Sequence, residues 1–444
     1  MSTVNNNGLV ALAFAIGLLS LSSSSTFAGD VSGILKSQTS FNTAESELQQ
    51  QEWQLDIEYD TGLWGGDLKA IGRIRLDTVD DLNQSSTADT FSAAAKPFAT
   101  KDWGSVELRE LYWETFVDNS FWRIGKQQVV WGEADGLKLL DVINPQNFRE
   151  FVLDDFDDSR IPLWMFNAEF TVTENGVLQV LWIPDTSVHN LAPSGSPYAF
   201  SRSSIVPKTA SDIAIQLRPA QAPRSPIKDS DIGLRYTDFV NGWDVSLNYL
   251  YHYVDEPIVS ASAHTNSETP HILMTQNYER SHLLGGTASS AIGDWTIRAE
   301  IAFETNRYHR TKQSLPGVVQ ANQWSSVIGL DYQGWSDQFI SVQWFQARIN
   351  ATQTDLIELI EHSQEDSVTF LWESNFINDT LKAKWLQIHS IDHGDGVFRP
   401  KVSYNLQSNL DVYLSADVFY GNKDTRFGQF DQGDRVSVGF EWGF

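Results

Sequence analysis

The chain ends in Val436-Ser437-Val438-Gly439-Phe440-Glu441-Trp442-Gly443-Phe444, where apolar side chains occupy every second position. Ser437, Gly439, Glu441 and Gly443 fall on the opposite face. Because successive side chains of a β-strand point to opposite faces, this stretch predicts a strand with one apolar and one polar surface. The apolar surface is aromatic, which favours a closed barrel with lipid outside and water inside over a soluble β-sandwich.

The same alternation recurs along the chain in segments of the length that crosses a bilayer at a tilt. The clearest segments begin at Trp53, Trp164, Trp243, Trp295 and Leu410. The connections between segments are alternately short and long. The short ones, rich in Gly, Asn and Asp, lie at 62–65, 118–120, 174–176, 241–242, 293–294, 334–337, 378–380 and 407–409. The long ones lie near 78–104, 132–163, 184–230, 254–280, 308–323, 350–365 and 421–433.

This organisation predicts an all-β protein, a transmembrane antiparallel β-barrel with short periplasmic turns and long extracellular loops. Counting back from Phe444, with one further strand near 31–41, gives roughly eighteen strands, an even number as such barrels require. Roughly sixteen result if the weakly patterned segments 177–183 and 281–291 do not cross the membrane. The strand pattern begins too early to leave room for a plug domain, so we expect passive rather than energised transport.

Composition excludes several other classes of protein. Aromatic residues reach 12% of the chain and include 16 Trp, which suits the aromatic girdles of membrane barrels. The mean hydropathy of −0.28 excludes a membrane helix bundle. The chain has no Cys, so disulfide frameworks and thiolate metal sites are excluded, and we expect no metal or cofactor. A net charge of −26 argues against nucleic acid as a partner.

The first 28 residues read as a secretory signal peptide, followed by a barrel domain over 29–444. Leu9 to Leu21 form an apolar stretch that is too short to span a bilayer comfortably, and Thr26-Phe27-Ala28 resembles a cleavage site. The stretch before Leu9 departs from the usual pattern because it has neither Lys nor Arg. Export through a signal peptide agrees with a location in the bacterial outer membrane.

The segment from Arg123 to Pro162 resembles a family of outer-membrane barrels of uncharacterised function, whose genes often accompany RND-type exporters of lipids or hydrophobic compounds. The resemblance rests on Arg-Ile-Gly-Lys-Gln and Trp-Gly-Glu within 123–133, Ile-Asn-Pro at 143–145 and Asp-x-Arg-Ile-Pro at 158–162. A weaker resemblance links the basic-Gly-basic-Gln strand to alginate-export barrels, which have eighteen strands. The resemblance to the family of uncharacterised function implies the fold and the location, and an RND-type exporter system as a partner. It says little about the substrate.

The connection at 132–163 is too apolar to remain in water, so we expect it to fold into the barrel mouth as a constriction loop. Its pore-lining residues are then predicted to be Trp131, Glu133, Asp141, Asn144 and Arg160. The alternative is a cap over the extracellular rim. Arg160 most simply forms an ion pair that fixes the loop, with Asp157 or Asp158 beside it.

Basic residues on the predicted inward faces could form a ladder that orients solutes. They are Arg73, Arg75, Arg298, Lys382, Lys384, Arg399, Lys401 and Arg435. The alternative is that neighbouring inward acids neutralise them in a static network that stiffens the wall.

These observations predict an outer-membrane channel, or an envelope transport partner, for a hydrophobic or amphipathic solute. The alternatives are a general diffusion porin for small hydrophilic solutes, an outer-membrane lipid hydrolase, and a structural or adhesive barrel. No Gly-x-Ser-x-Gly, His-Glu-x-x-His or phosphate-binding loop occurs, so we do not expect an enzyme. Expected partners are outer-membrane lipid, lipopolysaccharide and the barrel-assembly machinery, for which the terminal strand ending at Phe444 resembles a signal.

Overall fold

The computed structural model describes residues 29–79, 90–101, 103–203, 205–206, 214–218, 222–264, 271–312, 317–360 and 362–444. The predicted signal peptide lies outside these residues. Within them, no helix is long and apolar enough to cross a membrane.

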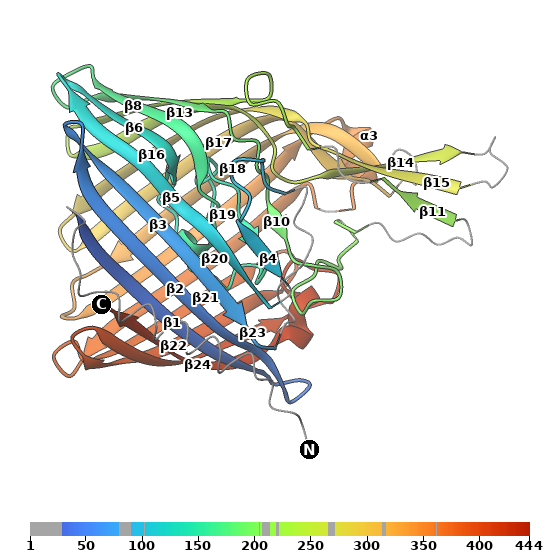
Figure 1. Ribbon diagram of the computed structural model, residues 1–444. Helices are drawn as coiled ribbons and strands as arrows, with labels where there is room; N and C mark the ends of the chain where they lie inside the picture. Colours follow the sequence, from blue (N-terminus) through green and yellow to red (C-terminus); the bar gives the residue numbers. More distant parts are fainter. Residues whose placement is uncertain are drawn as a thin grey trace.

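Among the described residues, eighteen antiparallel strands close into one barrel, and a short nineteenth strand, β4 (Ala99–Lys101), pairs with β5. Figure 1 shows the barrel from the side. The predicted barrel is therefore confirmed with the larger strand count, because the weakly patterned segments form β9 and β16. The barrel strands are β1 (Asp30–Asn42), β2 (Glu47–Leu63), β3 (Gly66–Asp77), β5 (Gly104–Val117), β6 (Ser120–Gln127), β8 (Leu163–Thr171), β9 (Val177–Ile183), β12 (Asp231–Val240), β13 (Trp243–Tyr253), β16 (Arg280–Ile292), β17 (Trp295–Arg310), β18 (Val318–Tyr332), β19 (Gln338–Asn350), β20 (Gln364–Phe376), β21 (Leu381–Ser390), β22 (Gly396–Gln407), β23 (Leu410–Tyr420) and β24 (Arg435–Gly443).

The terminal strand closes the barrel. β24 pairs with β23 on one side and with β1 on the other, in a register that runs from Ile34 opposite Gly443 to Asn42 opposite Arg435. Ser437 is buried toward the interior, whereas the neighbouring Val438 is 53% exposed on the outer surface. A barrel of this kind leaves no free strand edge within the bilayer, as a lipid environment requires.

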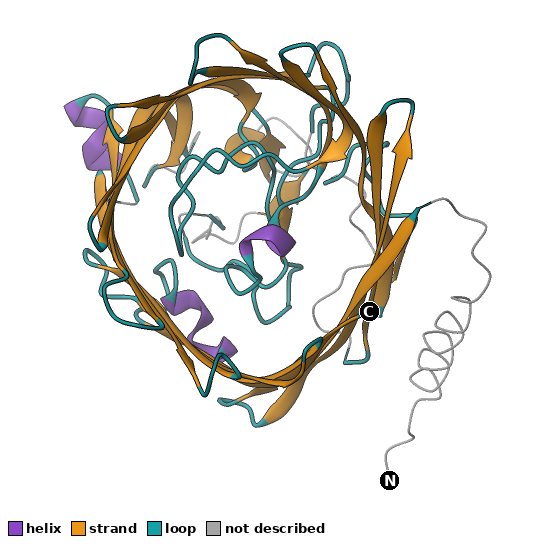
Figure 2. Ribbon diagram, turned by 90° about the vertical axis from the view of Figure 1, so that its left-hand side faces the viewer, coloured by secondary structure: helices purple, strands orange, loops and turns teal. Residues whose placement is uncertain are grey.

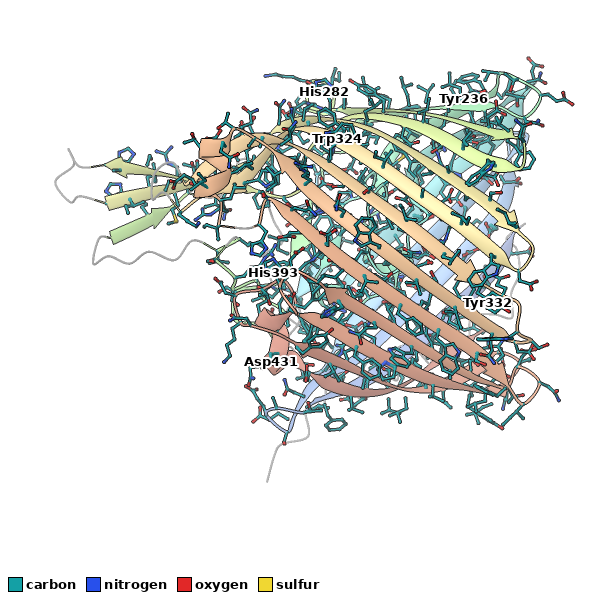
Figure 3. The ribbon with its side chains drawn as sticks, turned by 180° about the vertical axis from the view of Figure 1, so that it is seen from behind. Tyr236, His282, Trp324, Tyr332, His393 and Asp431 are labelled. Atoms are coloured by element: carbon teal, nitrogen blue, oxygen red, sulfur yellow. The ribbon has the colours of Figure 1, made fainter. Side chains whose placement is uncertain are left out.

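The outer wall carries the apolar residues that the alternation predicted. Leu247, Ile301, Ile328 and Leu414 are exposed there, and aromatic pairs such as Trp295–Tyr332 and Phe303–Trp324 lie toward its two ends. Figure 3 shows Tyr332 near the end with the short turns and Trp324 nearer the opposite end. This distribution agrees with two aromatic girdles at the membrane interfaces.

All the predicted short turns lie at one end of the barrel, together with the C-terminus (Figure 1). The opposite end carries the long connections, together with the short β1–β2 and β21–β22 connections. Two long connections differ from the prediction. The loop expected at 308–323 spans only 311–317, because β17 and β18 extend further. The segment 254–280 contains the hairpin β14 (Ile258–His264) and β15 (His271–Asn277), which projects beyond the barrel with β11 (Ala214–Leu217) in Figure 1.

The remaining elements are small. β7 (Asn147–Phe148) pairs in parallel with β10 (Asn190–Leu191), and α2 (Phe156–Ser159) lies in the connection between β6 and β8. α3 (Gln353–Glu358) lies between β19 and β20, and η1 (Gly428–Gly433) lies between β23 and β24.

Candidate functional site

The connection between β6 and β8, residues 128–162, folds into the barrel and is called the lumen loop below. Figure 2 looks into the barrel and shows loops and a short helix inside the ring of strands. Apolar side chains of the lumen loop are buried against inward-facing apolar residues of the wall. Leu140 and Ile143 belong to a cluster with Leu181, Leu250 and Leu283 of the wall.

A second apolar cluster fixes the other half of the lumen loop. Leu137, Phe151 and Leu153 are buried together with Phe419 of β23 and Phe430 of η1. The apolar residues that made this segment unsuited to water are thus used in packing against the wall. They do not form an exposed apolar collar, and an uncovered patch of this size would be unfavourable in water.

Ion pairs add directional ties between the lumen loop and the wall. Glu150, whose side chain is 3% exposed, accepts hydrogen bonds from Arg149 at 2.6 Å and from Arg435 of β24 at 2.6 Å. Arg149 also pairs with Glu52 of β2, and Arg435 pairs with Asp417 of β23 at 2.8 Å. Buried pairs of this kind are costly to break, because the remaining partner keeps a buried charge.

Further ties join the lumen loop to β17, across the barrel, and to β1 and β3, beside the strands named above. Arg298 pairs with Asp135 at 2.5 Å, and Glu300 accepts hydrogen bonds from the backbone N–H groups of Glu133 and Leu140. Asp158 pairs with Lys36 of β1 at 2.8 Å and with Arg73 of β3 at 2.6 Å. The lumen loop is therefore tied to strands around much of the barrel.

The five predicted pore residues lie in or beside this docked segment. Trp131 is 1% exposed and donates to Gln179, and Asn144 is 1% exposed and bonds to backbone groups of Gln127, Val129 and Ile161. Asp141 and Arg160 form a buried pair at 2.8 Å, and Arg160 also pairs with Asp157. The loop-fixing pair expected for Arg160 is present, with Asp141 as its buried partner, and Asp158 binds elsewhere.

The five predicted pore residues differ in whether they border a lumen cavity. Asp141 and Asn144 border a lumen cavity, whereas Trp131, Glu133 and Arg160 border neither of the two large lumen cavities described below. In this structure the last three brace the loop. A part for any of the five in permeation stays a prediction.

The predicted basic residues lie on inward positions, and most of them have an acidic partner. Arg73 pairs with Asp56, Arg75 with Glu52, Arg298 with Asp331, Lys384 with Glu373, Arg399 with Asp417, Lys401 with Glu441 and Arg435 with Glu150. Lys382 is exposed and lies opposite Asn375 and Ser403 in the neighbouring strands. This arrangement matches the neutralised network more closely than a free basic ladder.

Two large cavities lie along the lumen, one on each side of the lumen loop. The first, called the turn-side cavity, has a volume of about 460 Å³ and reaches toward the short turns, where Lys384, Lys401 and Glu441 border it. The second, the loop-side cavity, has a volume of about 370 Å³ and is bordered by Phe148, Phe345 and several acidic side chains of the long loops. Polar and charged side chains outnumber apolar ones in the described lining of both cavities, and the second has more apolar residues than the first.

Four residues of the lumen loop border both cavities and are called the junction: Gly136, Val152, Asp154 and Phe156. The junction combines a residue without a side chain, two apolar side chains and one carboxylate. Burial, together with the neighbouring Glu150 carboxylate, raises the pKa of Asp154 to about 6. Asp154 Oδ2 is buried and has no hydrogen-bond partner among the described residues.

Sequence reasoning did not identify the junction or the Arg149–Glu150 tie. A signal existed, because Arg149 and Glu150 are adjacent charges inside a segment predicted to be buried. Charges in such a segment need partners, and inward residues such as Glu52 could have been considered.

Several histidines of the described residues have a polar partner. His389 contacts Tyr420, His393 contacts Glu365, and His189 accepts a hydrogen bond from the backbone of Gln146. Within the described ranges, no three His, Asp or Glu side chains are grouped as a metal site would need.

Two known structures with a similar fold are proteins of Pseudomonas aeruginosa. OccK2 (OpdF) in complex with glucuronate is 12% identical, with 94% of this chain and 98% of that chain covered and a TM-score of 0.51. OccK1 (OpdK) is 10% identical, with 93% and 98% covered and a TM-score of 0.50. At these identities the likeness establishes the fold, and a closed barrel of this type supports a bacterial outer-membrane location.

No curated protein sequence matches the chain. These structural matches carry no information on an RND-type exporter or on alginate. One family model does match, over residues 54–380, and its description is a protein of unknown function (DUF1302). Because this match covers well over half of the sequence, the chain belongs to the DUF1302 family.

Proposed function

We propose that this protein is a passive outer-membrane channel for small amphipathic solutes. The observation that carries the proposal is the pair of cavities that meet at Gly136, Val152, Asp154 and Phe156. A solute passing this junction contacts apolar side chains and a carboxylate within one narrow segment. Solutes with a short apolar body and a polar or cationic group are favoured there, because both parts find a complementary surface.

A strictly hydrophobic solute is less well supported. The turn-side cavity is bordered by Lys36, Lys384, Lys401 and Glu441, among other charged groups. An apolar molecule would gain little in such a cavity and would leave charged groups poorly solvated. Direct delivery of lipid would need an apolar route, and the large apolar clusters of the lumen loop are instead buried against the wall.

General diffusion of small hydrophilic solutes is the second candidate. The mutual neutralisation of the lumen charges favours it, since a balanced wall selects weakly between solutes. The OccK2 structure contains glucuronate, a small organic acid, which makes glucuronate a useful probe for this chain.

The experiment compares solutes of equal size in liposomes that contain the refolded protein. Liposome swelling is measured with a neutral sugar, with glucuronate, with an aromatic amine and with an aromatic carboxylate. The proposal predicts that the aromatic amine enters faster than the sugar and that Phe156→Ala reduces this difference. Equal rates for all four solutes would support general diffusion, and the absence of swelling with every solute would overturn the channel.

A further inference from the structure

A small cavity lies between the lumen loop and the barrel wall, and Arg75 and Asp158 border both it and the turn-side cavity. Its volume is about 70 Å³, and it lies between the wall formed by β3, β5 and β6 and the loop residues Asn147, Arg149 and Asn190. Basic side chains dominate its lining: Arg73, Arg75, Arg109, Lys126 and Arg149. Only two carboxylates, Glu107 and Asp158, line it.

The basic side chains are deeply buried, with exposures between 4% and 7%. Asp158 is already shared between Arg73 and Lys36. Arg109 donates only to the backbone carbonyl groups of Asp157 and Asp158, and Lys126 donates only to those of Ala95 and Leu108. In the described part of the chain, neither Arg109 nor Lys126 has a carboxylate within 4.0 Å. Since Asp158 already pairs with Arg73 and Lys36, Glu107 is the remaining lining carboxylate that can balance the charges of Arg109 and Lys126.

Three residues of this lining carry an unused donor. Arg73 Nη1, Arg75 Nε and Arg149 Nε are buried and have no hydrogen-bond partner among the described residues. Arg75 Nε lies 3.3 Å from Glu52 Oε1, without the geometry of a hydrogen bond. Buried N–H groups are nearly always satisfied in folded proteins, so three such donors on residues that line one cavity call for an acceptor that the described residues do not supply.

We infer that this cavity binds a small inorganic oxyanion of the phosphate or sulfate type. Guanidinium groups present planar sets of N–H donors that match oxyanions, and a charged acceptor would satisfy the unused donors and compensate Arg109 and Lys126 together. The cavity has room for more than one water molecule, and therefore for a compact oxyanion, but not for an organic solute of the size expected in the passage.

The position of the cavity gives the oxyanion a structural consequence. Arg73, Arg75 and Arg109 belong to the barrel wall, whereas Arg149 belongs to the lumen loop. An oxyanion between them joins the wall to the loop. It would therefore stabilise the docked loop whatever solute the channel carries, and this inference does not depend on the proposed function.

The test is thermal unfolding of the full-length refolded barrel in detergent, at constant ionic strength, with chloride replaced stepwise by phosphate or sulfate. We expect a saturable rise in Tm for wild type. Lys126→Met should weaken the apparent affinity at least about tenfold, because one charge-assisted contact is lost. Lys69→Met, which removes a wall lysine that pairs with Glu58 on the same β2–β3 hairpin, should leave the affinity unchanged.

If Lys126→Met does not fold, Arg109→Lys replaces it, since this variant keeps the charge and loses the planar fork of donors. A wild-type Tm that does not respond to either oxyanion would mean that the cavity holds water only, and would overturn the inference. Equal losses in Lys69→Met and Lys126→Met would also overturn it, because the response would then reflect the general charge of the lumen.

Discussion

Glu150→Gln is the substitution that should release the lumen loop with the least change in shape. The Glu150 side chain is 3% exposed and accepts hydrogen bonds from Arg149, Arg435 and Gln50. Glutamine keeps the volume and one acceptor oxygen but removes the negative charge. Two buried guanidinium groups then lose a charged partner at once.

The magnitude follows from what the two arginines retain. Removing one partner of a buried ion pair costs about 3–5 kcal/mol. Arg149 keeps Glu52, and Arg435 keeps Asp417, so we expect the lower end, about 3 kcal/mol. Since about 1.4 kcal/mol corresponds to a factor of ten, the ratio of docked to displaced loop should fall on the order of a hundredfold.

The assay is single-channel recording in planar bilayers, with the unfolding midpoint measured in parallel. Glu150→Gln should show frequent steps to a higher conductance that are rare in wild type. Glu114→Gln is the matched control, because Glu114 pairs with Arg123 at 2.7 Å within the wall, both side chains are 29% exposed, and neither belongs to the lumen loop. Such a pair contributes about 1 kcal/mol at most. If Glu150→Gln behaves like Glu114→Gln, the ion-pair network does not hold the loop.

Three further predictions concern the wall, the junction and assembly. Leu414→Arg, at a side chain that is 57% exposed on the outer wall, should destabilise the barrel by about 2–4 kcal/mol in reversible urea unfolding, whereas Ser415→Arg on the lumen face should be tolerated. Equal effects of the two substitutions would show that the two faces are not distinct. Because the pKa of Asp154 is raised to about 6, its carboxylate is charged at pH 7.5 and neutral at pH 5, so the preference for cations in reversal-potential measurements should decline as the pH falls through 6. Asp154→Asn should show the low preference at every pH, and a variant with the same pH response as wild type would count against the junction. Removing Phe444, whose backbone exchanges hydrogen bonds with Gly33, should reduce the heat-modifiable, folded fraction in the outer membrane; normal assembly would argue against a role in insertion.

The barrel could be predicted from the sequence because strand polarity is a local property. Val438 and Gly439 are neighbours in the chain and lie on opposite faces. The alternation is weak in the segments of β9 and β16, so sixteen strands stayed an alternative until the structure showed eighteen. The projecting hairpin of β14 and β15 was missed. Its third strand, β11, pairs in parallel from a distant part of the chain, and local alternation does not report such a pairing.

The candidate site was predictable only in part, because its contacts are distant in sequence. The excess of apolar residues in 132–163 was enough to predict a buried loop, since that surface is unfavourable in water. The partners of that loop could not be derived in the same way. Arg149 and Glu52 are 97 residues apart, and their contact depends on the path of the loop through the lumen.

The central claim is that the lumen loop divides an otherwise open barrel into two cavities that meet at a narrow junction. Single-channel conductance of wild type, compared with a variant in which 136–156 is replaced by a short Gly-Ser linker, tests this claim most directly. We predict a small, steady conductance for wild type and a several-fold larger one for the variant, because ions then avoid the loss of hydration at the junction. A folded variant that conducts no better than wild type would contradict the claim.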